Sequence, residues 1–150
     1  QDRVNHYIRA GKEDGARVLA GGTPSELAAG GGFFVTPTIF TDVKNDMRVA
    51  QEEVFGPVLS IIAFEDEAEA LAIANDTIYG LAAGVWTRDM SRGHRMAQRL
   101  HAGTVWVNCY NMYDLSSPFG GYKISGIGKE LGRHALDLYT QHKSVWIGLQ

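Results

Sequence analysis

The sequence contains very little cysteine, no excess of basic residues and no long apolar run. Its single cysteine, Cys109, excludes an internal disulfide and a metal site built from several cysteines, and it fits a reducing compartment. The 17 Asp and Glu outnumber 14 Lys and Arg, and the net charge of −3 argues against general binding to nucleic acid. Glycine, proline or charged residues interrupt every apolar stretch before the roughly 18 residues that a membrane helix needs. We therefore expect a soluble, cytoplasmic protein with neither a membrane nor a nucleic-acid partner.

Histidine is scattered and glycine is concentrated. The five histidines lack the spacing of a zinc site, so no metal is expected. Glycine makes up 18 of the 150 residues, and five of these lie between Gly120 and Gly132. A phosphate-binding P-loop does not fit there, because Lys123 stands where its first glycine belongs and Glu130 follows Lys129. The glycine spacing is also one residue too wide for a dinucleotide fingerprint. The window predicts a tight turn followed by the start of a helix.

Hydrophobic periodicity predicts an α/β fold with a mostly parallel sheet and flanking helices, because two strand-helix-strand units follow one another with short connections. Asp66 and Asp89 stand where helix N-caps belong, and Glu69 follows Asp66 at the spacing of a capping box. The expected strands cover residues 17–20, 33–40, 57–64, 81–87, 104–108 and 143–149. The expected helices cover the N-terminus to about residue 11, residues 67–74, 90–101 and 129–139.

Two carboxylates and an aromatic residue precede the strand expected at 57–64. Glu53 could accept hydrogen bonds from vicinal ribose hydroxyls, and the face of Phe55 could pack on a flat heterocycle. A solvated Glu pair beside a core phenylalanine explains the same residues, and exposed glutamate is common.

Other chemistry-bearing residues have simpler explanations. Cys109 has no histidine near it in sequence, which favours a buried structural thiol over a catalytic one. Four arginines recur on one face of the helix expected at 90–101 or just before it, and a solvated outer face is favoured over a phosphate- or partner-binding stripe. These arginines are Arg88, Arg92, Arg95 and Arg99.

Four ordered segments together resemble the C-terminal part of the aldehyde dehydrogenase superfamily. The resemblance implies a catalytic-domain α/β sheet over residues 1–139 and, over residues 140–150, a strand that leaves the domain and joins an oligomerisation sheet. The segments are Glu52-Glu-Val-Phe-Gly-Pro-Val58, Tyr79-Gly-Leu-Ala-Ala-Gly-Val85, Ala102-Gly-Thr-Val-Trp-Val-Asn108 and Ser117-Pro-Phe-Gly-Gly-Tyr-Lys-Ile-Ser-Gly126.

The same resemblance implies a nicotinamide cofactor, NAD or NADP. Glu53 matches the carboxylate that holds the nicotinamide ribose, and Phe55 matches the aromatic residue packed beside the nicotinamide. Leu81 matches a hydrophobic contact near the same ring. NAD and NADP are not distinguished by these residues.

An aldehyde is the substrate that the resemblance implies. Asn111, Tyr113 and Phe119 match residues that line the substrate tunnel. Glu130 matches a carboxylate that does not touch the substrate and is proposed to relay protons. Cys109 does not match the family's nucleophile. Which aldehyde is oxidised is not readable from these residues.

The family oxidises an aldehyde to a carboxylic acid through a thiohemiacetal, using a nucleophilic cysteine and a general-base glutamate that match nothing in this chain. We therefore expect the chain to be a fragment that is inactive alone and belongs to an NAD(P)-dependent enzyme. The resemblance also implies a homo-oligomer, a dimer or tetramer, assembled through the C-terminal strand. The alternative is a non-catalytic assembly or interaction module that pairs with another chain through that strand.

Overall fold

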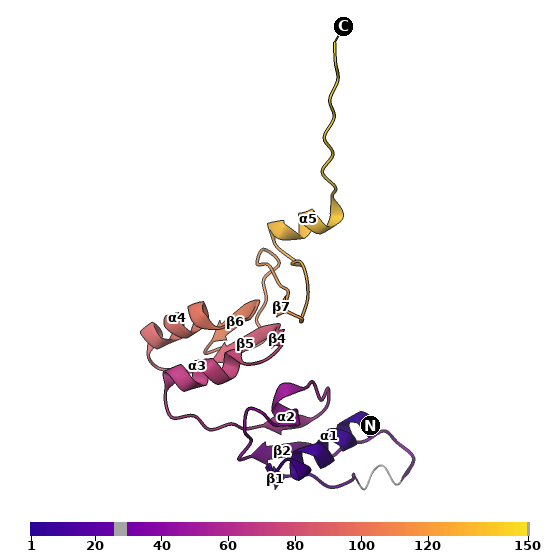
Figure 1. Cartoon of the computed structure of the whole chain (residues 1–150), viewed down its shortest axis with the longest axis vertical. Coiled ribbons are helices and arrows are strands. Elements are labelled where there is room, and N and C mark those ends of the chain that lie inside the picture. The colour runs from indigo at the N-terminus through magenta and orange to yellow at the C-terminus, as the bar shows by residue number, and fades with distance from the viewer. Residues whose placement is uncertain (26–29, 150) are drawn as a thin grey trace. The chain divides into compact units, whose positions relative to one another are not determined.

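The chain forms two units, Gln1–Asp76 and Thr77–Gln150 (Figure 1). The computed structural model describes residues 1–25 and 30–149, so Gln150, the end of the segment expected at 140–150, lies outside the described residues. Among these described residues, no helix is long and apolar enough to cross a membrane. A domain boundary between residues 139 and 140 stays a prediction from the sequence.

The first unit is built on a small mixed sheet whose strands lie in the order β1-β2-β3. The central strand β2 (Thr38–Thr41) pairs antiparallel with β1 (Arg17–Ala20) and parallel with β3 (Val58–Ser60). The register between β1 and β2 shifts after the pair Val18↔Phe40. Helix α1 (Asp2–Glu13) precedes the sheet, and α2 (Arg48–Gln51) and α3 (Glu67–Asn75) follow β2 and β3 respectively.

A single cluster of apolar side chains forms the core of the first unit. Phe40 at the middle of β2 is 0% exposed, and α1 contributes Val4 and Ile8 from one face. Apolar residues three to four positions apart on a helix share a face, which explains why α1 docks in this way. The rest of the buried cluster consists of Ala16, Val43, Met47 and Val49.

Both predicted helix caps are confirmed. The Asp66 carboxylate accepts a hydrogen bond of 2.9 Å from the Glu69 backbone N–H, and the Glu69 carboxylate accepts one of 2.6 Å from the Glu65 N–H. In the second unit, Asp89 accepts a hydrogen bond of 3.1 Å from the Arg92 N–H at the start of α4 (Met90–Arg99). The two aspartates satisfy N–H groups that the first turn of a helix leaves without a partner, and Glu69 holds the residue just before the cap of α3.

The second unit contains the strand-helix-strand arrangement that the sequence predicts. Strands β5 (Ala82–Val85) and β6 (Thr104–Val107) are parallel over four residue pairs, from Ala82↔Thr104 to Val85↔Val107. Helix α4 connects them and packs against both. A separate antiparallel pair joins β4 (Tyr79–Gly80) to β7 (Tyr122–Lys123).

The α/β class is thus confirmed, but the sheet differs from the expected one. Parallel pairs β2–β3 and β5–β6 are accompanied by antiparallel pairs β1–β2 and β4–β7, and they form three small sheets. The strands expected at 33–40 and 57–64 are observed only as β2, which extends one residue past the expected range, and β3, because strand pairing among the described residues is confined to these positions. Propensity marks apolar extended segments, whereas pairing decides how many of their residues become strand.

One prediction near the C-terminus was wrong, and a second stays a prediction. The helix expected at 129–139 begins only with the 3₁₀ turn Arg133–Ala135 and continues as α5 (Leu136–Tyr139). Residues before it cannot be helical, because Leu131 and Gly132 have φ of +60° and +57° and Glu130 pairs with Phe119. Residues 143–149 are assigned no strand within the described chain, and the strand expected there, which would pair in a sheet with another subunit, stays a prediction.

Candidate functional site

Three aromatic side chains of the second unit meet edge to face beside β6. The ring of Tyr113 lies 5.5 Å from the Trp106 ring at 85° and 5.1 Å from the Phe119 ring at 86°. Trp106 is 6% exposed, and its indole Nε1–H donates a hydrogen bond of 2.9 Å to the carbonyl of Met112. Edge-to-face geometry brings the positive edge of one ring onto the negative face of the next. The buried tryptophan therefore anchors the loop that carries Tyr113 to the strand.

The second half of this loop is closed by backbone pairing. Phe119 and Glu130 exchange two hydrogen bonds of 2.7 Å, and the Gly132 N–H donates one of 2.9 Å to the carbonyl of Leu115. At its φ of +57°, a Cβ on Gly132 would lie 2.8 Å from the carbonyl oxygen of Ser116. Glycine adopts a positive φ without strain and has no Cβ to clash with that oxygen. Gly132 therefore permits the chain to return beside residues 115–116.

Lys129 and Gly103 hold the glycine-rich turn against the start of β6. The Lys129 ammonium donates hydrogen bonds to the carbonyls of Gly120 and Gly121, and it lies 4.6 Å from the centroid of the Tyr122 ring. The carbonyl oxygen of Gly120 comes so close to Gly103 that a Cβ there would lie 1.7 Å from it. This close backbone approach gives a steric reason for glycine at position 103.

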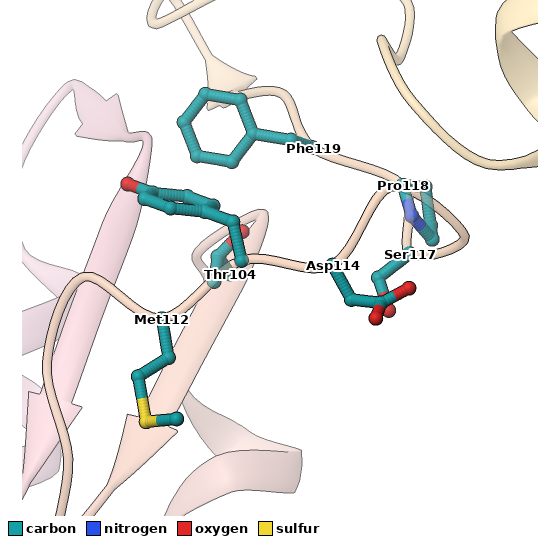
Figure 2. Close-up of a pocket in the computed structure, with 7 residues that line it drawn as sticks. Thr104, Met112, Asp114, Ser117, Pro118 and Phe119 are labelled. Atoms are coloured by element: carbon teal, nitrogen blue, oxygen red, sulfur yellow. The ribbon is translucent and has the colours of Figure 1, made fainter.

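Phe119 lines two cavities of the second unit. The first, about 400 Å³, is called the aromatic cavity here (Figure 2). The second, about 260 Å³, contains Leu81, Glu130 and the glycine-rich turn in its lining. A mostly apolar hollow with few polar groups is the usual form of a small-molecule site. The residues lining the aromatic cavity are Thr104, Met112, Tyr113, Asp114, Ser117, Pro118 and Phe119.

Asp114 is the acidic residue of the aromatic cavity. Hydrogen bonds from the Ser116 hydroxyl and from the Ser116 backbone N–H hold the pKa of this carboxyl below its ordinary value. The backbone carbonyl of Asp114 also accepts a hydrogen bond of 3.0 Å from the Ser117 N–H. Asp114 is therefore a carboxylate at neutral pH, held by the turn that it begins.

Asn108 is a positioning residue that our sequence reasoning missed. Its side-chain oxygen accepts a hydrogen bond from the Thr87 N–H, and its amide donates one to the Thr87 carbonyl, both 2.8 Å long. Its own N–H donates to the Val85 carbonyl, and its φ is +55°. The ends of β5 and β6 are thereby tied together just before the loop. The available signal was an asparagine directly after a strand, because asparagine tolerates this backbone region.

In the first unit, Glu53 and Phe55 lie on one exposed loop between α2 and β3. Phe55 is 83% exposed and has a φ of +54°, so the interpretation of Phe55 as a core residue was wrong. Glu53 is also exposed, while its neighbour Glu52 accepts a hydrogen bond of 2.6 Å from the Tyr7 hydroxyl. A bulky residue in the left-handed region is uncommon and is found at functional sites, where the surrounding structure stabilises it.

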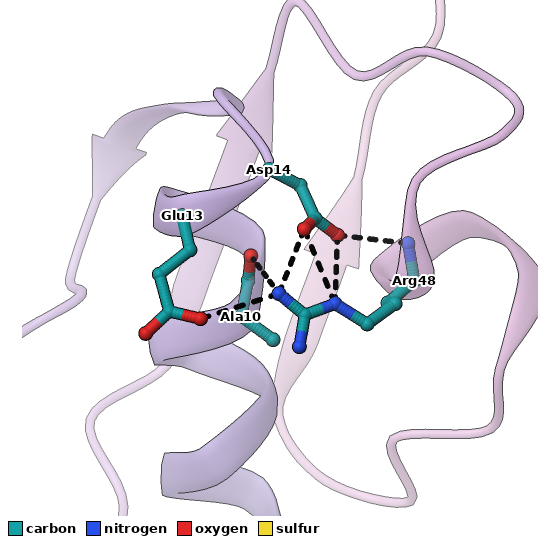
Figure 3. A network of polar contacts seen from close by, with 4 residues as sticks. All are labelled: Ala10, Glu13, Asp14 and Arg48. Atoms are coloured by element: carbon teal, nitrogen blue, oxygen red, sulfur yellow. Dashed lines mark hydrogen bonds and ion pairs between the residues drawn. The ribbon is translucent and has the colours of Figure 1, made fainter.

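A network around Arg48 fixes the start of α2, ahead of that loop (Figure 3). The Arg48 guanidinium donates to both carboxylate oxygens of Asp14, at 2.7 Å and 3.1 Å, and to Glu13 at 3.2 Å. Its backbone N–H also donates to Asp14, at 3.1 Å, and a further guanidinium hydrogen bond reaches the Ala10 carbonyl. These contacts join the end of α1 to the beginning of α2, and a planar guanidinium suits such paired acceptance.

This network predicts a pH dependence of stability. Hydrogen bonds from the Arg48 side chain and backbone lower the pKa of Asp14 from its ordinary value of 3.8. The carboxylate of Asp14 therefore stabilises the folded unit at pH values above 3.8, and this stabilisation is lost as the pH falls through the lowered pKa. We expect Asp14→Asn to reduce the fall in the urea midpoint between neutral pH and about pH 3. Asp46→Asn, at an exposed position of the same unit, is the control, and an unchanged pH profile for Asp14→Asn would contradict the assignment.

The structure brings some of the predicted site residues together. Tyr113 and Phe119 share the aromatic cavity, whereas Leu81, Phe119 and Glu130 share the second one. Asn111 is exposed, with a φ of +58°, and is not among the residues described as lining either cavity.

Two expectations about side chains outside the cavities are also answered. Cys109 is partly exposed, so the prediction of a buried thiol was wrong. The four arginines on or just before α4 are exposed, as expected for an outer helix face. Sequence reasoning also missed Trp106, whose ring contacts Tyr113, and Met112 and Asp114, which line the same cavity as Tyr113. The Asp-x-Ser pattern at Asp114 was a local signal of the turn there.

These features describe an α/β protein with an aromatic-lined small-molecule cavity, and comparison with known proteins gives its family. The aldehyde dehydrogenase family matches residues 1–145. The chain is 51% identical over 148 residues to a betaine aldehyde dehydrogenase of Brucella anthropi, covering 98% of this chain and 30% of the relative. It is 52% identical over 144 residues to an aldehyde dehydrogenase of Emericella nidulans, covering 96% of this chain and 28% of the relative.

Solved structures agree with the sequence comparison. The crystal structure of an indole-3-acetaldehyde dehydrogenase complexed with NAD⁺ superimposes with a TM-score of 0.90 at 53% identity, covering 99% of this chain and 30% of that one. An NAD⁺ complex of a Mycobacterium tuberculosis aldehyde dehydrogenase gives 0.89 at 50% identity, covering 98% of this chain and 30% of that one. This chain belongs to the aldehyde dehydrogenase family, as its four motifs predicted, and it spans about 30% of the length of these relatives.

Proposed function

We propose that this chain is the C-terminal part of an NAD(P)-dependent aldehyde dehydrogenase that oxidises an aldehyde to a carboxylic acid. The identity of 50% or more to aldehyde dehydrogenases over nearly the whole chain is the observation that carries this proposal. Two of these neighbours are NAD⁺ complexes, which supports a nicotinamide cofactor. The nucleophile and general base belong to other parts of the enzyme, so the catalytic contribution of this chain is binding and positioning.

The first unit is assigned the nicotinamide ribose and ring. Glu53 is an exposed carboxylate, and such a group can accept hydrogen bonds from both ribose hydroxyls at once. Phe55, two residues later, presents an exposed ring, so an aromatic face is available for the flat nicotinamide. These two residues fit the cofactor, whose bound nicotinamide accepts a hydride in this chemistry. Leu81, a residue of the second unit, is proposed from the family resemblance alone as an apolar contact of the cofactor.

The second unit is assigned the aldehyde. Tyr113 and Phe119 are held at a fixed angle by the ring contacts described above, so they can surround the carbon chain of a substrate and exclude water. Asn111 precedes them on the same loop and is assigned to the tunnel mouth. Glu130 is assigned a proton-relay role, supported by its place beside Phe119 in the second cavity.

Assembly into a cytoplasmic homo-oligomer through residues 140–150 is part of the proposal. Val145, Trp146 and Ile147 are exposed in the described chain, and an apolar extended segment can add to the edge of a sheet in another subunit. The mass of the full-length enzyme in solution, compared with the mass of one subunit, tests whether it forms a homo-oligomer.

Replacing Glu53 by glutamine in the full-length enzyme tests the proposed function. We expect kcat to fall by about tenfold or more, because the neutral amide holds the ribose hydroxyls less firmly and the nicotinamide is less well oriented. NADH formation from a simple aldehyde such as propanal measures the effect. Glu52→Gln is the matched control, since that carboxylate is already bonded to Tyr7. Unchanged kinetics for Glu53→Gln would remove Glu53 from the cofactor site, and no aldehyde oxidation by the unaltered enzyme would refute the function itself.

A further inference from the structure

The loop that carries Glu53 and Phe55 is not held by backbone pairing. Among the described residues, no backbone-to-backbone hydrogen bond involves residues 53–55. The Val54 side chain packs against the core of the first unit, but Glu53 and Phe55 on either side of it are exposed. A segment without backbone hydrogen bonds opens easily unless neighbouring side chains restrain it. The direction of the Glu53 carboxylate therefore depends on side chains that reach this loop from other elements.

Two side chains from the first turn of α1 contact this loop. The Arg3 guanidinium donates a hydrogen bond to the backbone carbonyl of Glu53. Val4 lies against the end of the loop, since a Cβ on Gly56 would come 2.5 Å from a methyl carbon of Val4. Val4 and Ile8 are buried in the core, so α1 is a fixed support. From this support, Arg3 supplies a directional hydrogen bond to the residue that is assigned to the ribose.

The Arg3 side chain is itself oriented by a neighbour one turn along α1. Arg3 and Tyr7 are four positions apart and therefore share a helix face. The guanidinium carbon of Arg3 lies 5.7 Å from the centroid of the Tyr7 ring, within the range of a cation–π contact. A planar guanidinium can stack on an aromatic ring and still donate hydrogen bonds from its edge. Arg3 therefore loses less freedom when it binds the Glu53 carbonyl than an unsupported side chain would.

We propose that Arg3 is a positioning residue for the cofactor: by holding the Glu53 carbonyl, its guanidinium fixes the direction in which the Glu53 carboxylate meets the nicotinamide ribose. This proposal rests on the cofactor role proposed above for Glu53. The carbonyl belongs to the rigid peptide plane that follows the Glu53 Cα, so holding it restricts rotation about the Cα–C bond of that residue. The competing explanation is that Arg3 serves only to dock α1 on the rest of the first unit.

A double-variant comparison in the full-length enzyme separates these explanations. The measured quantity is the rate of NADH formation in a single turnover of propanal, because this rate reports hydride transfer to the nicotinamide rather than product release. We expect Arg3→Met to lower this rate by about fivefold when Glu53 is present, since a loosely held carboxylate orients the ribose less well. In the Glu53→Gln background, we expect Arg3→Met to change the rate by less than about twofold, because the carboxylate on which Arg3 acts is gone.

Arg3→Met removes the guanidinium with little effect on the helix. Methionine has a high helix propensity, and Arg3 is exposed, so the substitution leaves no cavity. A smaller folded fraction would lower the rate by the same factor in both backgrounds, so it cancels in the comparison. Arg9→Met is the matched control, because it removes another exposed arginine of α1, which at this spacing lies on a different face of the helix. We expect this control to leave the rate within about twofold in both backgrounds.

The same fall in both backgrounds, or no fall in either, would overturn the proposal and leave Arg3 with a structural role alone. If Glu53→Gln by itself still slows NADH formation in that case, the cofactor role of Glu53 stands and only the role of Arg3 is refuted. Failure of the unaltered enzyme to oxidise any aldehyde would instead refute the dehydrogenase function, so the two failures are distinct.

Discussion

Replacing Gly103 by alanine is expected to lower the activity of the full-length enzyme by about a hundredfold, because displacing a positioning loop by about 1 Å has an effect of this size. The added Cβ would lie 1.7 Å from the carbonyl oxygen of Gly120 and 2.9 Å from its carbon. A backbone oxygen cannot turn aside as a flexible side chain can. The turn that follows Phe119 must therefore move away from β6, and the Phe119 wall of both cavities moves with it.

Steady-state kinetics with a simple aldehyde and the apparent melting temperature measure this effect. Gly30→Ala is the matched control, because a Cβ at that position meets no atom of the described residues within 4 Å and the backbone needs no positive φ. We expect Gly30→Ala to retain full activity. Gly103→Ala with kinetics within about twofold of the unaltered enzyme would show that the turn accommodates a methyl group, contrary to the geometry.

Replacing Phe40 by alanine is expected to lower the free energy of unfolding of the first unit by about 3–5 kcal/mol, the range observed for deletion of a buried aromatic ring. Phe40 is fully buried at the centre of β2 and packs within the cluster that contains Val4 and Ile8 from α1. Its carbonyl also accepts a hydrogen bond of 2.9 Å from the Ile61 N–H just beyond β3. The substitution leaves a cavity where helix and sheet meet.

Urea unfolding of the 150-residue chain followed by far-ultraviolet circular dichroism measures this loss. Phe33→Ala is the control of identical chemistry: Phe33 is 93% exposed, and we expect a change within about 0.5 kcal/mol. Phe40→Leu, which keeps most of the apolar volume, is expected to lie between the two. Equal midpoints for Phe40→Ala and Phe33→Ala would contradict the assignment of Phe40 to the core.

The elements that depend only on residues close together in the sequence could be predicted from it. Asp66 and Asp89 cap their helices as expected, because a cap requires only a side chain and an N–H three residues later. The parallel pairing of β5 with β6 followed from a short strand-helix-strand pattern. The helix expected at 129–139 failed at its start, because Glu130 pairs with Phe119, eleven positions earlier in the chain, and no local pattern contains that contact.

The candidate site was predicted in part, for the same reason. The four motifs indicated the family, and the comparisons confirm it. The residues Glu53, Phe55, Leu81, Asn111, Tyr113, Phe119 and Glu130 were named from that resemblance, and their roles stay proposals. The exposure of Phe55 could not be predicted from the residues alone, because an aromatic side chain is normally buried. Phe55 also has a positive φ, and a loop's backbone angles are set by the chain before and after it rather than by one residue type.

The sequence by itself determined the α/β class, the helix caps, the family and the absence of an internal disulfide, because each depends on composition or on short-range pattern. Only the tertiary structure showed that Trp106, Tyr113 and Phe119 form one aromatic row, that Asp114 shares its cavity, and that Gly103 touches the turn at Gly120. These relations join positions between five and 17 residues apart through backbone geometry and side-chain packing. Packing of this kind is decided by the whole folded unit, so it leaves no periodic signal along the chain.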